Sequence, residues 1–445
     1  MEDGKIKMFV CGPTVYDYIH IGNARTFVIF DVVAKYLRYR GFDVNYIQNI
    51  TDIDNKIIER AQKEGVAPLG YAKKYTEIFK EDMKALGITS PEYKNATDHI
   101  PEVIKQVQVL LDKGNAYTIE GDGIYFDLST FPDYGKLSGR TASMADDAVS
   151  RIDDSDKKRN RGDFALWKFD SHTGDPHWPA PFGDGRPGWH IEDTAITDEY
   201  FGPQYDIHGG GMDLMFPHHE AEIAQQESAS GLKPFVKYWM HSGFLVNKSE
   251  KMSKSLGNFL TLHEALENYS KETLRFYFLS NHYRAPLELT DQSLKAAQAG
   301  VNRISEVLHK LDLLEDQTGG SILGDLHSRA TEDLVVAMDD DFNTPRAFAV
   351  IFDFVKNING ILSQGGLAVS DANLVREVFK QVSDLFGIVP SNITTIPDDI
   401  QQLIDQRDQA RQAKDFTTSD QLRKKLLDMG YKVEDTAYGP LVKKN

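Results

Sequence analysis

The sequence predicts an α/β protein with a doubly wound parallel sheet, an insertion within that sheet domain and a helical carboxy-terminal region. The apolar segment KMFVC is followed by a helical pattern that stops at Gly41 and then by the strand-like DVNYIQNI. A strand, a helix and a second strand in this order form a βαβ unit, which implies parallel strands. Sheets of this kind bind nucleotides at the carboxyl ends of their strands.

The pattern changes between about residues 113 and 188. A hairpin-like segment, AYTIEGDGIYFDL, leads into a stretch that is rich in Gly, Pro, Asp and Ser and has few periodic apolar residues. Strand-like and helix-start patterns return with YDIHGGGMDL and PHHEAEIAQQES. We therefore predict that residues 1–112 and 189–262 form two halves of the sheet domain, with 113–188 as a connective insertion.

The last third of the chain has helical periodicity almost throughout. The periodic segments lie near 291–315, 328–363, 371–387, 398–413 and 416–429. Short breaks between them are typical of a bundle of antiparallel helices. We predict a helical bundle over residues 263–390 and a small terminal module over 391–445.

Composition limits the classes of function. The chain has 445 residues, of which 41% are hydrophobic and 26% charged, as expected for a globular protein. A net charge of -17 argues against general affinity for nucleic acid, although a local basic surface remains compatible with it. No apolar run approaches the roughly 20 residues of a membrane helix, and the first residues do not resemble a secretion signal. We expect a cytoplasmic protein with no membrane partner.

The only cysteine of the chain, Cys11, excludes an internal disulfide and fits a reducing compartment. A single thiol serves equally well in packing, as a metal ligand or as a nucleophile. Its role depends on the residues that surround it in the fold.

Five segments taken together are similar to motifs of the class I cysteinyl-tRNA synthetases. They are, in order, CGPTVYDYIHIGNAR, NITDIDNKI, GRPGWHIED, DIHGGGMDLMFPHHEAEIAQ and EKMSKSLGNF. HIGN or KMSKS alone occurs by chance in many proteins, but this order over nearly the whole chain is specific. The resemblance implies a Rossmann-like nucleotide-binding domain that activates L-cysteine with ATP and Mg²⁺ and transfers it to tRNA(Cys). It also implies that residues 391–445 bind the anticodon, and we expect a monomer.

Adenylate formation places negative charge on the α-phosphate of ATP, so the site needs donors and cations directed at that group. His20 and Asn23 offer donors at a helix start, while Lys251 and Lys254 of KMSKS bring ammonium groups on a loop. By resemblance, HIGN stands for the family's HIGH with Asn23 as a departure, and Lys254 corresponds to the lysine that contacts ATP. The predicted ATP-binding residues are Gly12, Thr14, Gly22, His208, Gly209, Gly210, Asp213 and Lys254.

The resemblance also implies one Zn²⁺ that recognises the thiol of the substrate, with Cys11, His218 and Glu222 matching three of its four ligands. The fourth position departs from the family, because GWHIED places Asp193 where a cysteine is expected. An aspartate can ligate zinc at about 2.0–2.2 Å. In the alternative interpretation, Asp193 caps the following segment and the metal is weak or absent. A bound zinc would distinguish cysteine from serine, because a thiolate bonds strongly to zinc and a hydroxyl does not.

Other residues of these motifs have two interpretations each. Trp189 and His190 match the substrate pocket of the family, or Trp189 is a core residue. Thr51 faces the cysteine, or it caps a helix that begins near Asp54.

The segment from His208 to Gly211 suggests a close approach of the backbone to adenosine, or it is a glycine-rich turn without a ligand. His219 and His241 are interpreted as structural residues.

The carboxy-terminal module carries a basic cluster. We predict RNA contacts for Arg411, Lys414, Arg423, Lys424 and Lys425, although such a cluster is usually only a solvated face.

Two other functions fit parts of the sequence. A ligase of the same catalytic fold that joins cysteine to a small amino sugar would have no use for residues 390–445. A non-catalytic RNA-binding relative would have no use for intact His20, Lys251 and Lys254.

Overall fold

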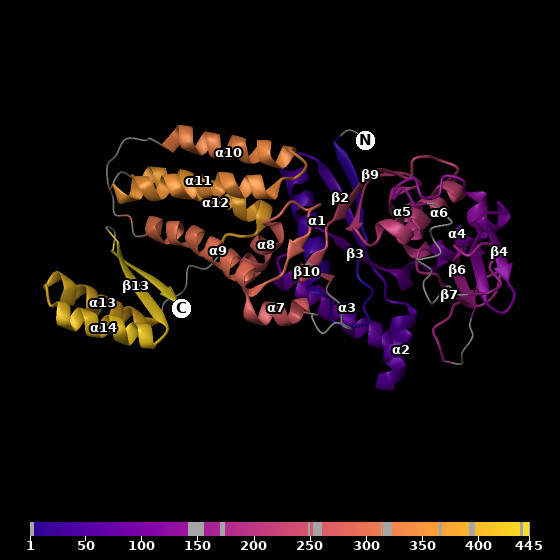
Figure 1. Cartoon of the computed structure of the whole chain (residues 1–445), viewed down its shortest axis with the longest axis horizontal. Helices are drawn as coiled ribbons and strands as arrows, with labels where there is room; N and C mark the ends of the chain where they lie inside the picture. The colour runs from indigo at the N-terminus through magenta and orange to yellow at the C-terminus, as the bar shows by residue number, and fades with distance from the viewer. Residues whose placement is uncertain are drawn as a thin grey trace. The chain divides into compact units, whose positions relative to one another are not determined.

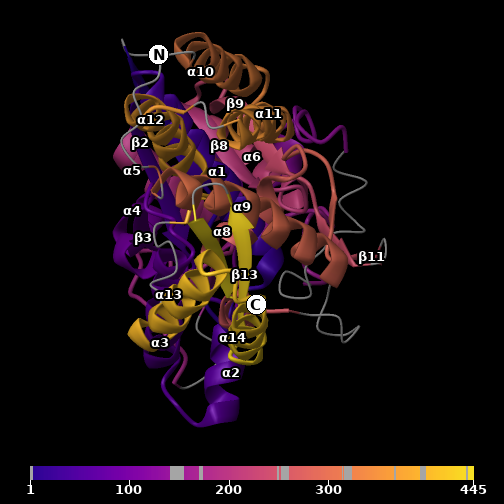
Figure 2. The same cartoon turned by 90° about the vertical axis from the view of Figure 1, so that its left-hand side faces the viewer.

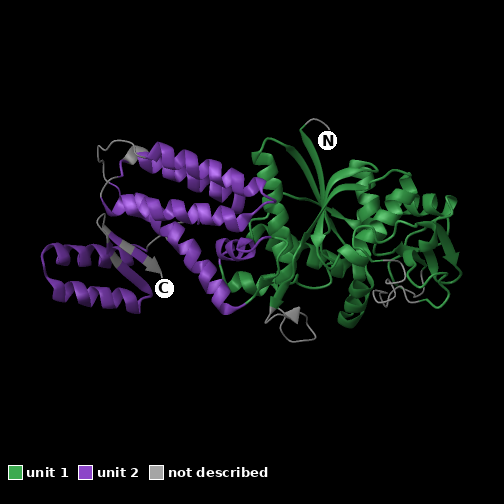
Figure 3. Ribbon diagram, turned by 45° about the horizontal axis from the view of Figure 1, so that its top comes forward, with its two compact units in different colours: residues 1–269, 283–289 green, residues 270–282, 290–445 purple. Residues whose placement is uncertain are grey.

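The computed structural model describes residues 4–140, 155–169, 174–247, 250–251, 260–312, 314, 323–364, 367–390, 397–436 and 439–444. The chain divides into two compact units (Figure 3). The first contains residues 1–269 and 283–289, and the second contains residues 270–282 and 290–445.

A five-stranded parallel sheet forms the centre of the first unit, in the order β3-β2-β1-β8-β9 (Figure 1). Its strands are β1 (Lys5–Val10), β2 (Asp43–Ile50), β3 (Glu92–Asn95), β8 (Tyr205–Gly211) and β9 (Val236–Ser242). Strand β1 pairs with β2 on one side and with β8 on the other. The winding therefore reverses at β1, and this is where such sheets open a crevice at the carboxyl ends of the strands. The predicted doubly wound fold is confirmed.

Helix α1 (Ile21–Tyr39) follows the HIGN turn and is buried along most of its length. Arg25 within it is fully buried and donates to the carbonyl oxygens of Gly243 at 2.8 Å and Ala285 at 2.7 Å. These charge-assisted bonds tie the start of the helix to the loops that follow the sheet. The other helices of this unit are α2 (Asn55–Glu64), α3 (Pro68–Ala85), α4 (Ile100–Asp112), α5 (Ile191–Phe201), α6 (Glu220–Ser230) and α7 (Leu262–Asn268).

The insertion forms a four-stranded antiparallel sheet in the order β4-β5-β6-β7. Its strands are β4 (Ala116–Ile119), β5 (Gly123–Phe126), β6 (Phe164–Phe169) and β7 (Gly185–Pro187). The predicted hairpin corresponds to β4 and β5 and is confirmed. Trp167 and Phe126 of this sheet belong to the same buried cluster as Phe9 of β1, so the insertion is packed onto the main sheet.

The second unit contains a helical bundle of α8 (Lys271–Leu279), α9 (Asp291–Asp312), α10 (Leu323–Asp339), α11 (Thr344–Ser363) and α12 (Val369–Phe386). The periodic stretch 328–363 contains two helices rather than one. Asp341 and Phe342 adopt φ angles of 52° and 53°, which a continuous helix does not allow. Asn343 then caps α11 by accepting from the backbone N–H of Arg346 at 3.2 Å.

The chain ends in a small module of α13 (Asp398–Gln412), α14 (Phe416–Asp428), β13 (Tyr431–Thr436) and β14 (Gly439–Lys444). Figure 2 shows its two helices side by side, with β13 next to them. Ile400, Ile404 and Leu426 pack with Tyr431 and Val433 in its core. The antiparallel hairpin was not predicted from the sequence.

The short strands β10 (Leu245–Asn247), β11 (Glu250–Lys251) and β12 (Leu287–Glu288) form a separate small sheet. None of the helices in the described part of the chain combines the length and the apolar character that a membrane crossing requires.

An ion pair between α3 and α7 is expected to respond to pH. His263 Nδ1 lies 3.0 Å from Asp82 Oδ1, and this hydrogen bond raises the pKa of His263 above its usual 6.5. Because the folded pKa of His263 is raised, the stabilisation is lost as the pH rises through that folded value. It is also lost at acid pH, where Asp82, whose pKa burial raises above its usual value, becomes protonated. We expect an NMR titration to show a His263 pKa above 6.5 that falls in Asp82→Asn. A value unaffected by Asp82→Asn would contradict the pairing.

Candidate active site

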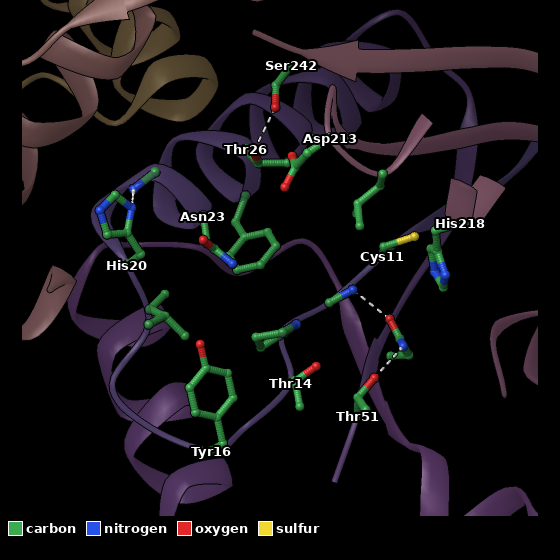
Figure 4. A pocket seen from close by; sticks show the side chains of 18 of the residues that line it. Cys11, Thr14, Tyr16, His20, Asn23, Thr26, Thr51, Asp213, His218 and Ser242 are labelled. Carbon is green, nitrogen blue, oxygen red and sulfur yellow. Dashed lines mark hydrogen bonds between the residues drawn. The ribbon is translucent and has the colours of Figure 1, made fainter. Parts of the chain in front are cut away.

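A cavity of about 400 Å³ lies at the carboxyl ends of β1 and β2, where the winding of the sheet reverses (Figure 4). This volume is in the range of pockets that hold small ligands. The cavity brings together predicted site residues that are far apart in the sequence. They are Cys11, Gly12, Thr14, His20, Gly22, Asn23, Thr51, Trp189, Asp193, Asp213 and His218.

The HIGN turn forms one wall of the cavity. His20 is the N-cap of α1, and its Nδ1 accepts from the backbone N–H of Gly22 at 2.9 Å. Because Nδ1 is an acceptor, a neutral His20 ring carries its proton on Nε2 and has that nitrogen as a donor. Asn23 lies one position further along the same first turn and also lines the cavity.

The chain at residues 260–262, which follows the KMSKS segment after a gap in the described residues, is hydrogen-bonded to this turn. The backbone N–H of Ile21 donates to Leu260 O at 3.0 Å, and that of Leu262 donates to Ile19 O at 3.0 Å. Leu260 and Leu262 therefore lie directly against the HIGN turn. Lys254 lies outside the described residues. Lys251 is described by its backbone, which belongs to β11.

Four predicted metal ligands converge at the base of the cavity. His218 Nε2 lies 3.0 Å from Asp193 Oδ2 and 3.1 Å from Glu222 Oε1. Cys11 Sγ lies 3.4 Å from Asp193 Oδ2 and 3.9 Å from Glu222 Oε1. All four side chains are buried. Cys11 follows β1, Asp193 lies in the first turn of α5, and the other two flank the start of α6.

These distances fit a tetrahedral zinc ion. Zinc bonds of about 2.0–2.3 Å give ligand-to-ligand separations of roughly 3.3–3.5 Å, close to those between the four side chains. Glu222 Oε2 is buried and makes no hydrogen bond among the described residues, although His208 Nδ1 lies 3.5 Å away. Burial, together with Asp193 and Glu222, raises the pKa of Cys11 well above its usual value. A divalent cation would relieve the crowding of these acidic groups.

His190 is hydrogen-bonded to His218. Its Nδ1 lies 2.7 Å from His218 Nδ1, so one ring nitrogen donates and the other accepts. Burial lowers the pKa of His190 well below its usual value, which keeps this ring neutral. If His218 ligates through Nε2, its Nδ1–H donates to His190, which is the arrangement usual for metal-bound histidines.

Trp189 stacks on His218 with a centroid distance of 4.7 Å. Its side chain is 37% exposed and lines the cavity, so its interpretation as a core residue is wrong.

A second set of ligand-type side chains lies beneath the first, and the sequence did not indicate it. His208 Nε2 and His219 Nε2 lie 3.3 and 3.2 Å from Cys11 Sγ, and Glu222 belongs to this set as well. His208 Nδ1 contacts the Tyr205 hydroxyl at 2.5 Å, and His219 Nδ1 contacts His241 Nε2 at 2.8 Å. The interpretation of His219 and His241 as merely structural is therefore incomplete. Tyr205 and His208 are three residues apart in β8, and the period-two alternation of a strand would place them on opposite faces, so the sequence offered no signal for this contact.

The structure corrects the expectation for the segment from His208 to Gly210. His208 is 0% exposed and, with its neighbours Gly209 and Gly210, lies inside β8 rather than in a turn. A Cβ at Gly209 would lie 2.4 Å from the ring of Phe30, so this glycine permits close packing of α1 on the sheet. A direct contact of His208 or Gly209 with ATP does not fit this burial, whereas Asp213 lines the cavity.

Two capping alternatives are also wrong. The N-cap of α2 is Asp54, whose side chain accepts from the Lys56 N–H, so Thr51 does not cap this helix. Thr51 instead donates to Glu192 Oε1 and lines the cavity. Asp193 lies in the first turn of α5, but its carboxylate contacts Asn49, His218 and Cys11.

The predicted RNA-binding residues lie on the terminal module and are exposed. Arg411 Nη1 pairs with Asp435 Oδ2 at 2.7 Å, beside the two bonds of 2.8 Å that Arg407 makes to the same carboxylate. Arg411 therefore also holds α13 on β13. Arg423, Lys424 and Lys425 are consecutive in α14 and point in different directions around it.

Comparison with known families gives three matches along the chain. Residues 1–299 match the family of tRNA synthetases class I (C) catalytic domains. Residues 335–390 match a DALR domain, and residues 394–439 match a cysteinyl-tRNA ligase anticodon binding domain.

Curated relatives match over nearly their full length. A cysteine–tRNA ligase of Trichlorobacter lovleyi is 46% identical, over 98% of this chain and 94% of the relative. One of Clostridioides difficile is 44% identical, over 99% and 95%. A structure of Mycobacterium tuberculosis methionyl-tRNA synthetase in complex with methionyl-adenylate has a TM-score of 0.64 at 15% identity, covering 86% of this chain and 92% of that chain. This last likeness concerns the fold.

Proposed function

The chain belongs to the cysteinyl-tRNA synthetase family, and from this premise we propose which of its residues hold the metal, the ATP and the cysteine. The enzyme activates L-cysteine with ATP to form cysteinyl-adenylate and transfers the cysteinyl group to tRNA(Cys). Relatives that match the whole chain, including the anticodon-binding end, do not favour a ligase with a small acceptor or a non-catalytic protein.

We propose that Cys11, Asp193, His218 and Glu222 hold one Zn²⁺. The observation that carries this proposal is their convergence from three separate parts of the chain, with separations of 3.0–3.9 Å between their ligand atoms. When bound, zinc supplies a soft Lewis acid that takes up a thiolate far better than a hydroxyl. Of the two sets, this one is favoured because Cys11, Asp193 and His218 all line the cavity.

The remaining residues of the cavity orient the cysteine. Trp189 closes the pocket over His218, and its ring presents an apolar face to the substrate side chain. His190 holds His218 in one orientation and one tautomer. Thr51 donates to Glu192, a buried carboxyl group that also lines the cavity, and so fixes the orientation of this group beside the substrate.

The HIGN side of the cavity receives ATP with its Mg²⁺. Its groups are the Nε2–H of His20, the amide of Asn23 and the backbone around Gly12, Thr14 and Gly22. The first turn of α1 also directs its N–H groups and the positive end of its dipole at the phosphates. Lys251 and Lys254 would supply the ammonium groups, since the chain that follows them is bonded to Ile19 and Ile21. Arg423, Lys424 and Lys425 remain proposed contacts of the tRNA.

Pyrophosphate exchange with cysteine and with serine tests this division of roles. We expect exchange with cysteine to depend on bound zinc, to disappear after chelation and to return when zinc is restored. Exchange with serine should stay at background in every state, because the hydroxyl is a poor ligand for zinc. Exchange with cysteine that is unchanged in metal-free protein would contradict the zinc proposal while leaving the activity itself intact.

A further inference from the structure

We propose that Asn49 positions Asp193 so that one carboxylate oxygen, Oδ2, faces the metal. The inference rests on the zinc site proposed above and adds a residue that does not itself bind the ion. Asn49 lies near the end of β2 and is 2% exposed. It belongs to the NITDID segment, in which the sequence had drawn attention to Thr51.

The contacts of Asp193 divide cleanly between its two oxygens. Asn49 Nδ2 donates to Oδ1 at 2.6 Å. Oδ2 is the atom that lies 3.0 Å from His218 Nε2 and 3.4 Å from Cys11 Sγ. A carboxylate can rotate and can bind a metal through one oxygen or both, so a strong donor on Oδ1 selects a single arrangement. Hydrogen bonds of this kind orient ligands and tune metal affinity.

The orientation of the Asn49 amide is itself fixed. Its Oδ1 accepts from the backbone N–H of Gly12 at 2.5 Å, which leaves the NH₂ group directed at Asp193. Gly12 is the neighbour of Cys11 in the chain. The Asn49 amide therefore links the backbone beside Cys11 to the side chain of Asp193, and both of these residues are proposed zinc ligands. A Cβ at Gly12 would lie 1.7 Å from the backbone oxygen of Asn49, which explains the glycine.

The same NH₂ group separates two buried acids. Asn49 Nδ2 lies 3.2 Å from Glu192 Oε1 as well as 2.6 Å from Asp193 Oδ1. Glu192 and Asp193 are both fully buried, so their carboxylates would repel each other strongly without a donor between them. Asn49 therefore stabilises an arrangement in which Asp193 directs Oδ2 at the metal.

Asn49→Leu tests the inference, because leucine has a similar shape and no donor. Zinc affinity is measured by competition with a chromophoric chelator on the folded, full-length chain. We expect binding to weaken by about 10- to 100-fold, as is typical when the partner of a metal ligand is lost. The visible spectrum of the Co²⁺-loaded protein should also change. Gln48→Met is the matched control, because it removes a neighbouring buried amide and should leave zinc affinity unchanged.

The same substitution in a chain that also carries Asp193→Cys shows whether Asn49 orients the Asp193 carboxylate or only stabilises the fold around it. In Asp193→Cys the ligand has one donor atom and no second oxygen to be held. When Asn49→Leu is added to the Asp193→Cys chain, zinc affinity should therefore fall by no more than about threefold. The contact with Gly12 is lost in the wild-type chain and in the Asp193→Cys chain alike, so that loss does not account for a difference between them. Equal weakening in both backgrounds would overturn the inference. Asn49→Ala provides the same comparison if the leucine variant does not fold. Wild-type protein that binds no zinc would instead overturn the metal site itself.

Discussion

Cys11→Ser is expected to abolish zinc retention and, with it, the activation of cysteine. Cys11 is the only thiol of the chain and lies in contact range of both sets of ligand-type side chains. A serine hydroxyl does not replace a thiolate on zinc, so we expect zinc affinity to fall by about 100-fold or more, beyond the effect of lesser changes around metal sites. Elemental analysis and pyrophosphate exchange on the same preparation measure the two effects.

The control for this variant is wild-type protein from which the metal has been removed. Both samples should show equally low exchange, and only the wild type should recover when zinc is added. Circular dichroism establishes that Cys11→Ser is folded. A Cys11→Ser protein that retains zinc and full exchange activity would show that the thiol is not a ligand.

His20→Ala is expected to lower the rate of adenylate formation by about 10²- to 10³-fold, or roughly 3 kcal/mol of transition-state stabilisation, as for one electrostatic donor. His20 lines the cavity proposed to receive ATP, and its Nδ1 caps α1. The alanine variant therefore also loses the cap, which costs about 1 kcal/mol of stability. Single-turnover adenylate formation and thermal unfolding measure the two losses separately.

His20→Ser separates capping from catalysis. Serine is a good N-cap and restores the acceptor for the Gly22 N–H, but it is too short to reach the phosphates. We expect its stability to match the wild type and its rate to match His20→Ala. A serine variant with the wild-type rate would mean that His20 acts only as a cap.

The arrangement of β1, α1 and β2 was predictable because each element carries its own periodic signal. The helix starts at HIGN and ends just before Gly41, and β2 spans the whole of DVNYIQNI. The division of the segment 328–363 was not predictable, because the left-handed residues Asp341 and Phe342 interrupt an apolar pattern that continues on both sides.

The four proposed zinc ligands were identified by resemblance, and the structure adds how they are held. Asn49 and His219 gave no sequence signal, because their roles depend on which strands are neighbours in the sheet. Asn49 of β2 contacts Asp193 of α5 because β2 is the neighbour of β1 in the sheet, and the sequence does not show which strands are neighbours. The glycines after His208 suggested a turn as one alternative, whereas here they continue a buried strand.

X-ray absorption at the zinc edge, with and without cysteine, tests the proposed site most directly. We expect one sulfur neighbour at about 2.3 Å in the free enzyme, from Cys11, and two when cysteine is bound, with the remaining neighbours nitrogen or oxygen. Serine should leave the sulfur count at one. A sulfur count that does not rise with cysteine, or that is zero in the free enzyme, would contradict recognition of the substrate thiol by a metal on Cys11.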